Sequence, residues 1–192
     1  GYQITGAAAL WTINNSMTIQ FYAHAYINRE LDKWYDFSDN DMYKDKIKKT
    51  SLFKNFVNKY LNNLNEYLEM IIHRNEIYFS DNTTINYGDK TKADYNEDLH
   101  LSIGKCTATI VIKKLFSCHF ATNVIRGYSV IVSITDHYDF KEEEWNDITN
   151  YINNILGYAP QESGMLIPYF WHIDFDYYSS VNPYIFVCKH GG

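Results

Sequence analysis

The sequence of 192 residues lacks the motifs by which several large enzyme classes are identified. It contains no Gly-x-Ser-x-Gly, no His-Glu-x-x-His and no Gly-x-x-x-x-Gly-Lys-[Ser/Thr] segment. It therefore gives no motif for a serine hydrolase, a zinc peptidase or a P-loop protein. Its three cysteines, Cys106, Cys118 and Cys188, form no Cys-x-x-Cys pair, which argues against a zinc signature and against a disulfide framework.

Long apolar runs and positive charge are scarce as well. No apolar stretch approaches the roughly 20 residues that a membrane-spanning helix needs, and no basic region with an apolar core predicts a signal peptide. The 17 Lys and Arg are outnumbered by 23 Asp and Glu, which argues against a nucleic-acid partner because phosphate binding needs a basic surface. From the lack of a spanning helix and a signal peptide we expect a soluble, untargeted chain. It starts GYQITGAAALW without an initiator Met, which fits either a fragment of a larger protein or an expression boundary.

Apolar and aromatic residues are plentiful and predict a folded chain. The hydrophobic fraction is 46% and the aromatic fraction 17%, which is enough for a substantial core. Apolar residues at helical spacing predict helices over residues 6–29, 51–73 and 142–156, the last with Glu142 to Glu144 in its first turn and Gly157 as its stop. Alternation and turn residues predict a hairpin over 77–87 and strands over 99–113, 128–135, 165–178 and 183–188.

This order of elements predicts an α+β fold. We expect N-terminal helices packed on a mainly antiparallel C-terminal sheet or half-barrel, with one inserted helix. Residues 1–192 are predicted to form a single domain, with a helical part over 1–75 and a sheet part over 76–192 that contains the helix near 142–156.

The first candidate site is the segment 136–140, Asp-His-Tyr-Asp-Phe, where a strand leaves the sheet. The period of two puts Asp136 and Tyr138 on the face of the apolar residues Val130 to Ile134, so Asp136 is predicted to be solvated on one side, with a raised pKa or a cation beside it. Alternatively, Asp139 caps the following helix and Asp136 fixes the turn.

The second candidate site is the segment 171–177, in which His172, Asp174 and Asp176 share one face of a strand. Nitrogen and carboxylate ligands together suit Mg²⁺, Mn²⁺, Zn²⁺ or Fe²⁺. Ligands on one strand face lie about 7 Å apart, so a metal site would need a residue from another strand. The alternative is a half-exposed strand whose polar face meets water.

The strand ending in Asp-x-Tyr-Asp-Phe and followed by a predicted helix resembles the signature region of colicin M-type bacteriocins, which hydrolyse the peptidoglycan precursor lipid II. The likeness covers about residues 98–176 and extends to C-terminal toxin domains of bacterial polymorphic and contact-delivered effectors. In the colicin M pattern a His-Arg pair follows the second acid, whereas residues 141–146 here read Lys-Glu-Glu-Glu-Trp-Asn.

The resemblance implies an antibacterial toxin domain that is secreted or delivered into the envelope or periplasm of a target cell. It implies a metal-assisted phosphoester or pyrophosphate hydrolase that acts on a cell-envelope precursor such as lipid II, and a cognate immunity protein as partner. The catalytic residues would be Asp136, Tyr138, Asp139 and His172. A divalent cation (Mg²⁺, Mn²⁺ or Ca²⁺) would be held among Asp136, Asp139, Asp174 and Asp176.

Two other functions stay open. The aromatic-rich helix over residues 53–72 could act on a membrane surface, which would make the chain a toxin without catalysis. The chain could also be a non-catalytic binding or structural module, in which the segment 136–140 is only a corner between strand and helix.

Overall fold

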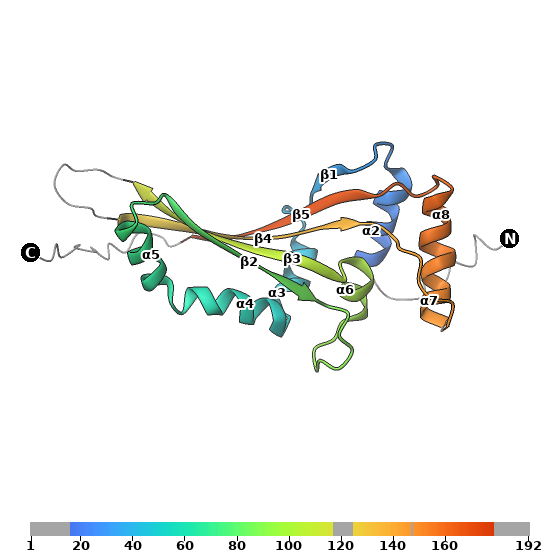
Figure 1. Cartoon of the computed structure of the whole chain (residues 1–192), viewed down its shortest axis with the longest axis horizontal. Coiled ribbons are helices and arrows are strands. Elements are labelled where there is room, and N and C mark those ends of the chain that lie inside the picture. Colours follow the sequence, from blue (N-terminus) through green and yellow to red (C-terminus); the bar gives the residue numbers. More distant parts are fainter. Residues whose placement is uncertain (1–15, 117–124, 147, 179–192) are drawn as a thin grey trace, which may run out of the picture.

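The computed structural model describes residues 16–116, 125–146 and 148–178, which form a long twisted sheet with helices along one side and at one end (Figure 1). The helices are α2 (Ser16–Ile27), α3 (Asp41–Lys48), α4 (Ser51–Leu61), α5 (Leu64–His73), α6 (Glu97–Ser102), α7 (Ile148–Asn153) and α8 (Ala159–Glu162), and a π-helical turn (Asn154–Tyr158) joins the last two. The strands are β1 (Lys33–Asp36), β2 (Tyr78–Asn86), β3 (Lys105–Phe116), β4 (Ile125–Tyr138) and β5 (Tyr169–Tyr178).

The five strands form one open sheet in the order β1-β5-β4-β3-β2. β1 runs parallel to β5, and the other neighbouring pairs are antiparallel. This confirms the predicted α+β fold with a mainly antiparallel sheet. β1 was not predicted: it is four residues long and lies within the part of the chain expected to be helical. The predicted strand over 183–188 lies outside the described residues.

Alternate residues of the central strands build the core. Phe21 of α2 packs at 5.3 Å from Trp171 between ring centroids, and Phe53 of α4 packs at 4.5 Å from Phe175. Each large apolar side chain buried in this way contributes about 1.5–3 kcal/mol. The buried residues of β3, β4 and β5 include Cys106, Ala108, Ile110, Ile112, Val130, Val132, Ile134, Trp171, Ile173 and Phe175. The predicted core face of β4 is thereby confirmed.

The apolar stripe of residues 51–73 lies on two helices, where one was predicted. α4 ends at Leu61 and α5 begins at Leu64, because Asn62 and Asn63 favour turns over helix interiors. The break lets both helices follow the twisted sheet (Figure 1). Phe53, Tyr60 and the other buried residues of the stripe belong to the core, and none of the helices in the described ranges is long and apolar enough to cross a membrane.

Two further predictions of local structure were wrong. Residues 77–87 form no hairpin, because the pairing of β2 with β3 runs unbroken from Tyr78 to Asn86. As an edge strand, β2 tolerates the turn-favouring residues 80–82. The predicted strand over 99–113 begins as helix α6, whose first turn is capped by Asn96 through a 3.0 Å hydrogen bond from the Leu99 N–H.

Candidate functional site

A cavity of about 480 Å³ lies where β4 ends, bordered by α2, α6 and the segment from α7 to α8. Asp136, Tyr138 and Asp139 line it, together with Phe140 and with Trp171 of β5. Three of the four side chains predicted to be catalytic are therefore brought to one cavity.

Asp136 stands at the border between the apolar core and this cavity. It continues the core face of β4, and its register partner on β5 is the fully buried Trp171. Burial, and after it the negative charge of Asp139, raises the pKa of Asp136, although the backbone N–H of His137 acts in the opposite direction. A raised pKa is one of the two outcomes expected from the sequence, the other being a cation beside the carboxylate. Such a carboxyl group exchanges a proton closer to neutral pH than a solvated aspartate does, or it accepts a cation.

Tyr138 is buried in a cluster of rings. Its ring centroid lies 5.6 Å from that of Phe21, 5.2 Å from that of Phe140 and 5.3 Å from that of Tyr169. Burial, followed by the influence of Tyr22, raises the pKa of Tyr138 above the usual tyrosine value. The hydroxyl group therefore keeps its proton at neutral pH and is able to donate a hydrogen bond.

Asp139 is the first residue beyond β4 and does not cap a helix. α7 begins only at Ile148, so the alternative in which Asp139 caps the next helix is wrong. The sequence predicted Glu142 to Glu144 as the first turn of that helix. They lie before α7 instead and have no regular secondary structure. Asp139 lies 3.8 Å from Nδ1 of His137, measured from its Oδ2.

Side-chain amides hold the segment that follows Asp139. Gln161 of α8 pairs with the backbone of Phe140, and Asn154 pairs with the backbone of Glu143. Nδ2 of Asn153 also donates to the carbonyl oxygen of Lys141 at 2.9 Å. These contacts fix residues 140–143, and with them one wall of the cavity.

Gly157 allows this wall to close. It is buried in the π-helical turn, and an added Cβ would overlap the ring of Phe140. The predicted role of Gly157 as a helix stop was wrong, because the chain continues from the turn into α8. Its physical role is to let the aromatic ring lie directly against the backbone.

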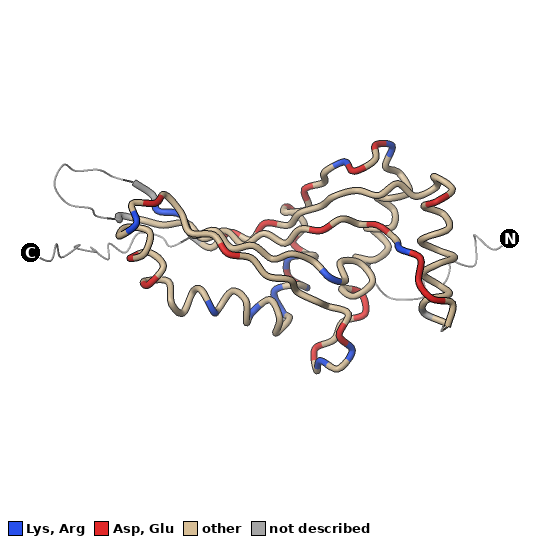
Figure 2. Tube along the Cα trace, in the orientation of Figure 1, with Lys and Arg blue, Asp and Glu red and all other residues tan. Residues whose placement is uncertain are grey.

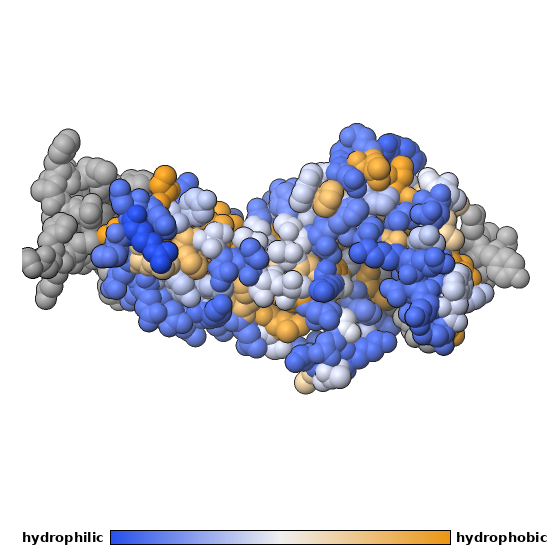
Figure 3. Space-filling view, viewed as in Figure 1, coloured by the Kyte–Doolittle hydropathy of each residue, from blue (hydrophilic) through white to orange (hydrophobic). Residues whose placement is uncertain are grey.

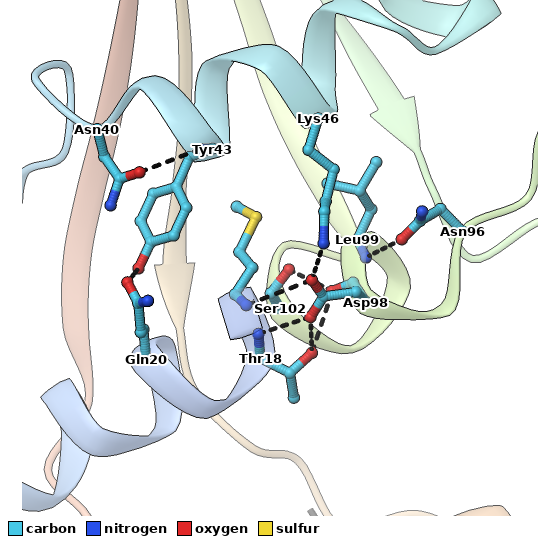
Figure 4. A network of polar contacts seen from close by, with 10 residues as sticks. Thr18, Gln20, Asn40, Tyr43, Lys46, Asn96, Asp98, Leu99 and Ser102 are labelled. Atoms are coloured by element: carbon cyan, nitrogen blue, oxygen red, sulfur yellow. Dashed lines mark hydrogen bonds and ion pairs between the residues drawn. The ribbon is translucent and has the colours of Figure 1, made fainter. Parts of the chain in front are cut away.

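A second network positions the helices at the other side of the cavity (Figure 4). The buried carboxylate of Asp98 accepts hydrogen bonds from the Thr18 N–H at 2.7 Å and the Met17 N–H at 3.3 Å, and from Lys46 of α3. Burial alone would raise the pKa of Asp98, but the hydrogen bonds from Lys46 and Thr18 outweigh it and lower the pKa. Asp98 thus joins α2, α3 and α6, and Thr18 and Ser102 of this network line the cavity.

The second predicted cluster does not reach the cavity. The register pairs His172 with Thr135 and Asp174 with Ser133, on the sheet face opposite the core face that carries Asp136. Nε2 of His172 lies 3.3 Å from Oδ1 of Asp36, and Asp174 accepts a 2.6 Å hydrogen bond from Ser133. Asp176 is exposed on the same face. The sheet therefore separates His172, Asp174 and Asp176 from Asp136 and Asp139.

The four carboxylates predicted to bind a metal ion are divided by the sheet. Asp136 and Asp139 line the cavity, whereas Asp174 and Asp176 lie on the opposite face. Among the residues that the structure describes, no group of three or more His, Cys, Asp or Glu side chains is placed to hold a metal ion. The cavity does offer the pair Asp136 and Asp139, whose charges interact. Two carboxylates fit a Mg²⁺ ion that keeps water and substrate oxygens as its remaining ligands.

The chain matches no protein-family model and none of the curated proteins. Among solved structures, it is similar to PaeM, a colicin M-like bacteriocin produced by Pseudomonas aeruginosa, with 13% sequence identity and a TM-score of 0.35. The likeness is distant. It covers 86% of this chain and 52% of PaeM, so the chain spans about half the length of that protein.

Sequence reasoning missed an aromatic stack across three strands, on the face that carries His172. Trp34 of β1 stacks on Phe170 of β5 at 4.9 Å, and Phe170 stacks on His137 of β4 at 4.3 Å. The stack depends on β1, whose four residues are too few for periodicity to reveal. The amides of Asn154 and Gln161 were also missed, although a polar side chain within an apolar helical pattern is a signal for such a contact.

Proposed function

We propose that the chain is an antibacterial toxin domain and that its activity depends on the cavity at the end of β4. The observation that carries the proposal is the position of residues 136–140. The segment that resembles the colicin M-type signature contributes two carboxylates, Asp136 and Asp139, and the tyrosine Tyr138 to one cavity.

The reaction that we propose is metal-assisted hydrolysis of a phosphoester or pyrophosphate in a cell-envelope precursor such as lipid II. The acids Asp136, Asp139, Glu97 and Glu143 line the cavity, and Lys105 is its single Lys or Arg among the described residues. An anionic substrate alone would be repelled by this surface. Asp136 and Asp139 would hold a divalent cation, which supplies positive charge to the phosphoryl oxygens when bound.

The other roles follow from the burial of each group. Burial raises the pKa of Asp136, and a bound cation would offset this effect by favouring the charged carboxylate, so Asp136 would act as a ligand of the cation. Tyr138, protonated at neutral pH, would donate a hydrogen bond to the substrate. We assign His172 no role in this cavity, because the sheet lies between them.

Expression in a bacterial host, with and without a periplasmic signal sequence, tests the proposed target. We expect growth to stop only when the domain reaches the periplasm, and co-expression of a cognate immunity protein to restore it. Growth arrest restricted to the cytoplasmic form would contradict an envelope target, and normal growth with both forms would contradict a toxin.

The proposed reaction is tested separately with the purified domain and lipid II. We expect release of the phosphorylated headgroup in Mg²⁺ and none after EDTA treatment. Equal release under both conditions would rule out metal assistance, and absence of release by a preparation that stops growth would rule out this substrate.

A further inference from the structure

The segment around α7 exposes an apolar surface on the helix that the sequence pattern predicted over residues 142–156. We call this surface the apolar ridge; it consists of Trp145, Ile148, Tyr151, Ile152 and Ile155, which are 38% to 76% exposed. Trp145 and Tyr151 contact each other edge to face, at 5.6 Å between centroids. Five large exposed apolar side chains within eleven consecutive residues form a concentrated patch of the kind that marks interaction sites.

The orientation of the ridge is fixed by contacts on the opposite side of the same segment. Asn154 is fully buried there. Its side-chain oxygen accepts a hydrogen bond from the Glu143 N–H, and its side-chain nitrogen donates one to the Glu143 carbonyl oxygen. The carbonyl oxygen of Leu156 accepts a 2.9 Å hydrogen bond from the Tyr22 hydroxyl. Turning the ridge toward the core would break these bonds and expose Gly157, so the apolar side chains are held outward.

The charge around the ridge selects among possible partners. Glu142, Glu143 and Glu144 are exposed directly before it, and residues 142–178 contain no Lys or Arg. Figure 2 shows an acidic run in the segment that leads into α7. An anionic lipid surface would be repelled, and interfacial helices usually carry basic residues beside their apolar face. A second copy of the chain would bring the same acids together.

We propose that the apolar ridge binds a protein partner that presents an apolar centre bordered by Lys and Arg side chains. Because Ile152 and Asn150 also line the cavity, such a partner would lie against the cavity mouth and restrict access to Asp136. The proposal concerns a surface and does not depend on whether the cavity is catalytic.

Binding of a defined peptide probe tests the proposal. The probe is an amphipathic peptide of about 14 residues with Leu at helical spacing and Lys elsewhere, and its control carries Glu in place of Lys. We expect the Lys peptide to bind the whole domain at least about tenfold more tightly than the Glu peptide, as measured by fluorescence anisotropy, and added salt to weaken the binding.

Matched variants locate the binding surface. Ile148→Asn should weaken binding of the Lys peptide about tenfold, whereas Ile77→Asn, at a similarly exposed isoleucine elsewhere, should leave it unchanged. Replacing Glu142, Glu143 and Glu144 with Gln should weaken binding too, while Glu66→Gln with Glu69→Gln on α5 should not. Binding that is indifferent to the ridge variants would overturn the proposal, as would equal binding of the two peptides.

Two further measurements test the alternative binding partners of the apolar ridge, a lipid surface and a second copy of the chain. Flotation with vesicles of phosphatidylcholine, alone or mixed with phosphatidylglycerol, should leave the domain unbound, and sedimentation should show a monomer at micromolar concentration. Vesicle binding that Ile148→Asn abolishes would identify a lipid surface instead of a protein. Self-association that the same variant abolishes would identify a second copy of the chain, and either result would overturn the proposal.

Discussion

The side-chain amide of Gln161 pairs with both backbone groups of Phe140. The Phe140 N–H donates to Oε1 at 2.9 Å, and Nε2 donates to the Phe140 carbonyl oxygen at 3.0 Å. Asn154 makes the same pair of bonds with Glu143, at 2.8 and 2.7 Å. The two amides take the place of a neighbouring strand where the chain leaves the sheet, so they hold the cavity wall beyond Tyr138.

Gln161→Ala should destabilise the domain by about 1–3 kcal/mol, because two hydrogen bonds are lost and the backbone groups of Phe140 lose their partners. Thermal unfolding measures the effect, and a decrease in Tm of about 2–4 °C is expected for each kcal/mol in a chain of this size. Asn55→Ala is the control, at an exposed position of α4. Equal Tm values for Gln161→Ala and the wild type would show that the pairing of Gln161 with Phe140 does not contribute to the stability of the domain.

Gly157→Ala should destabilise the domain by about 1–3 kcal/mol, because the added methyl group overlaps the ring of Phe140. Phe140→Ala removes that ring and should make the substitution at Gly157 far less costly. A double-mutant cycle measured by chemical denaturation gives the coupling between the two positions. Additive effects would contradict direct packing of the ring on this glycine.

Asp98→Asn should lower stability at neutral pH, because it removes the negative charge beside Lys46, and Asp98→Ala should cost about 3 kcal/mol or more. The folded pKa of Asp98 is depressed, so its contribution is present above the unfolded pKa of about 3.9 and is lost as pH falls through the lower folded pKa. The Tm difference between wild type and Asp98→Asn should therefore shrink below pH of about 4.

Asp45→Asn, at an exposed position of α3, is the control for this pH dependence. A Tm difference between wild type and Asp98→Asn that stays constant down to the acid limit of folding would show that the Asp98 carboxylate is not the group responsible.

His24 should make the domain less stable under mildly acidic conditions. Its Nδ1 is buried and has no hydrogen-bond partner within the described ranges 16–116, 125–146 and 148–178, and burial lowers the pKa of His24. The unfolded chain then binds the proton more readily, so stability is complete above the unfolded pKa of about 6.5 and falls as pH decreases below it. His24→Phe should reduce this slope in a series of Tm measurements, whereas His73→Phe at an exposed position should not.

The fold and the first candidate site could be predicted because both depend on strand alternation. The pattern of Val130, Val132 and Ile134 fixed the core face of β4, and the same period placed Asp136 and Tyr138 at its end. His172 was included in that site although alternation puts it on the outward face of β5, because the sequence does not show that β5 lies beside β4 in the same sheet. The alternation of Trp171, Ile173 and Phe175 shows the inward face of β5, but not which strands lie beside it.

The segment around α7 was predicted least well, because the helix begins only at Ile148 and the chain continues past Gly157 into α8. The structure buries Asn154 and Gly157 and exposes Ile148 and Ile152. A hydrophobic pattern identifies which residues share a helix face, but the side that is buried also depends on hydrogen bonds with distant backbone groups. Exposed apolar residues are not confined to α7. Figure 3 shows hydrophobic patches between hydrophilic areas on the face in view.

The most direct test of the account is growth inhibition by two double variants, each directed to the periplasm at equal expression and with folding verified by circular dichroism. Asp136→Asn with Asp139→Asn alters the cavity, whereas Asp174→Asn with Asp176→Asn alters the opposite face of the sheet. The account predicts that the first variant loses toxicity and that the second remains as toxic as the wild type. Full toxicity of the first variant, or loss confined to the second, would contradict the assignment of function to this cavity.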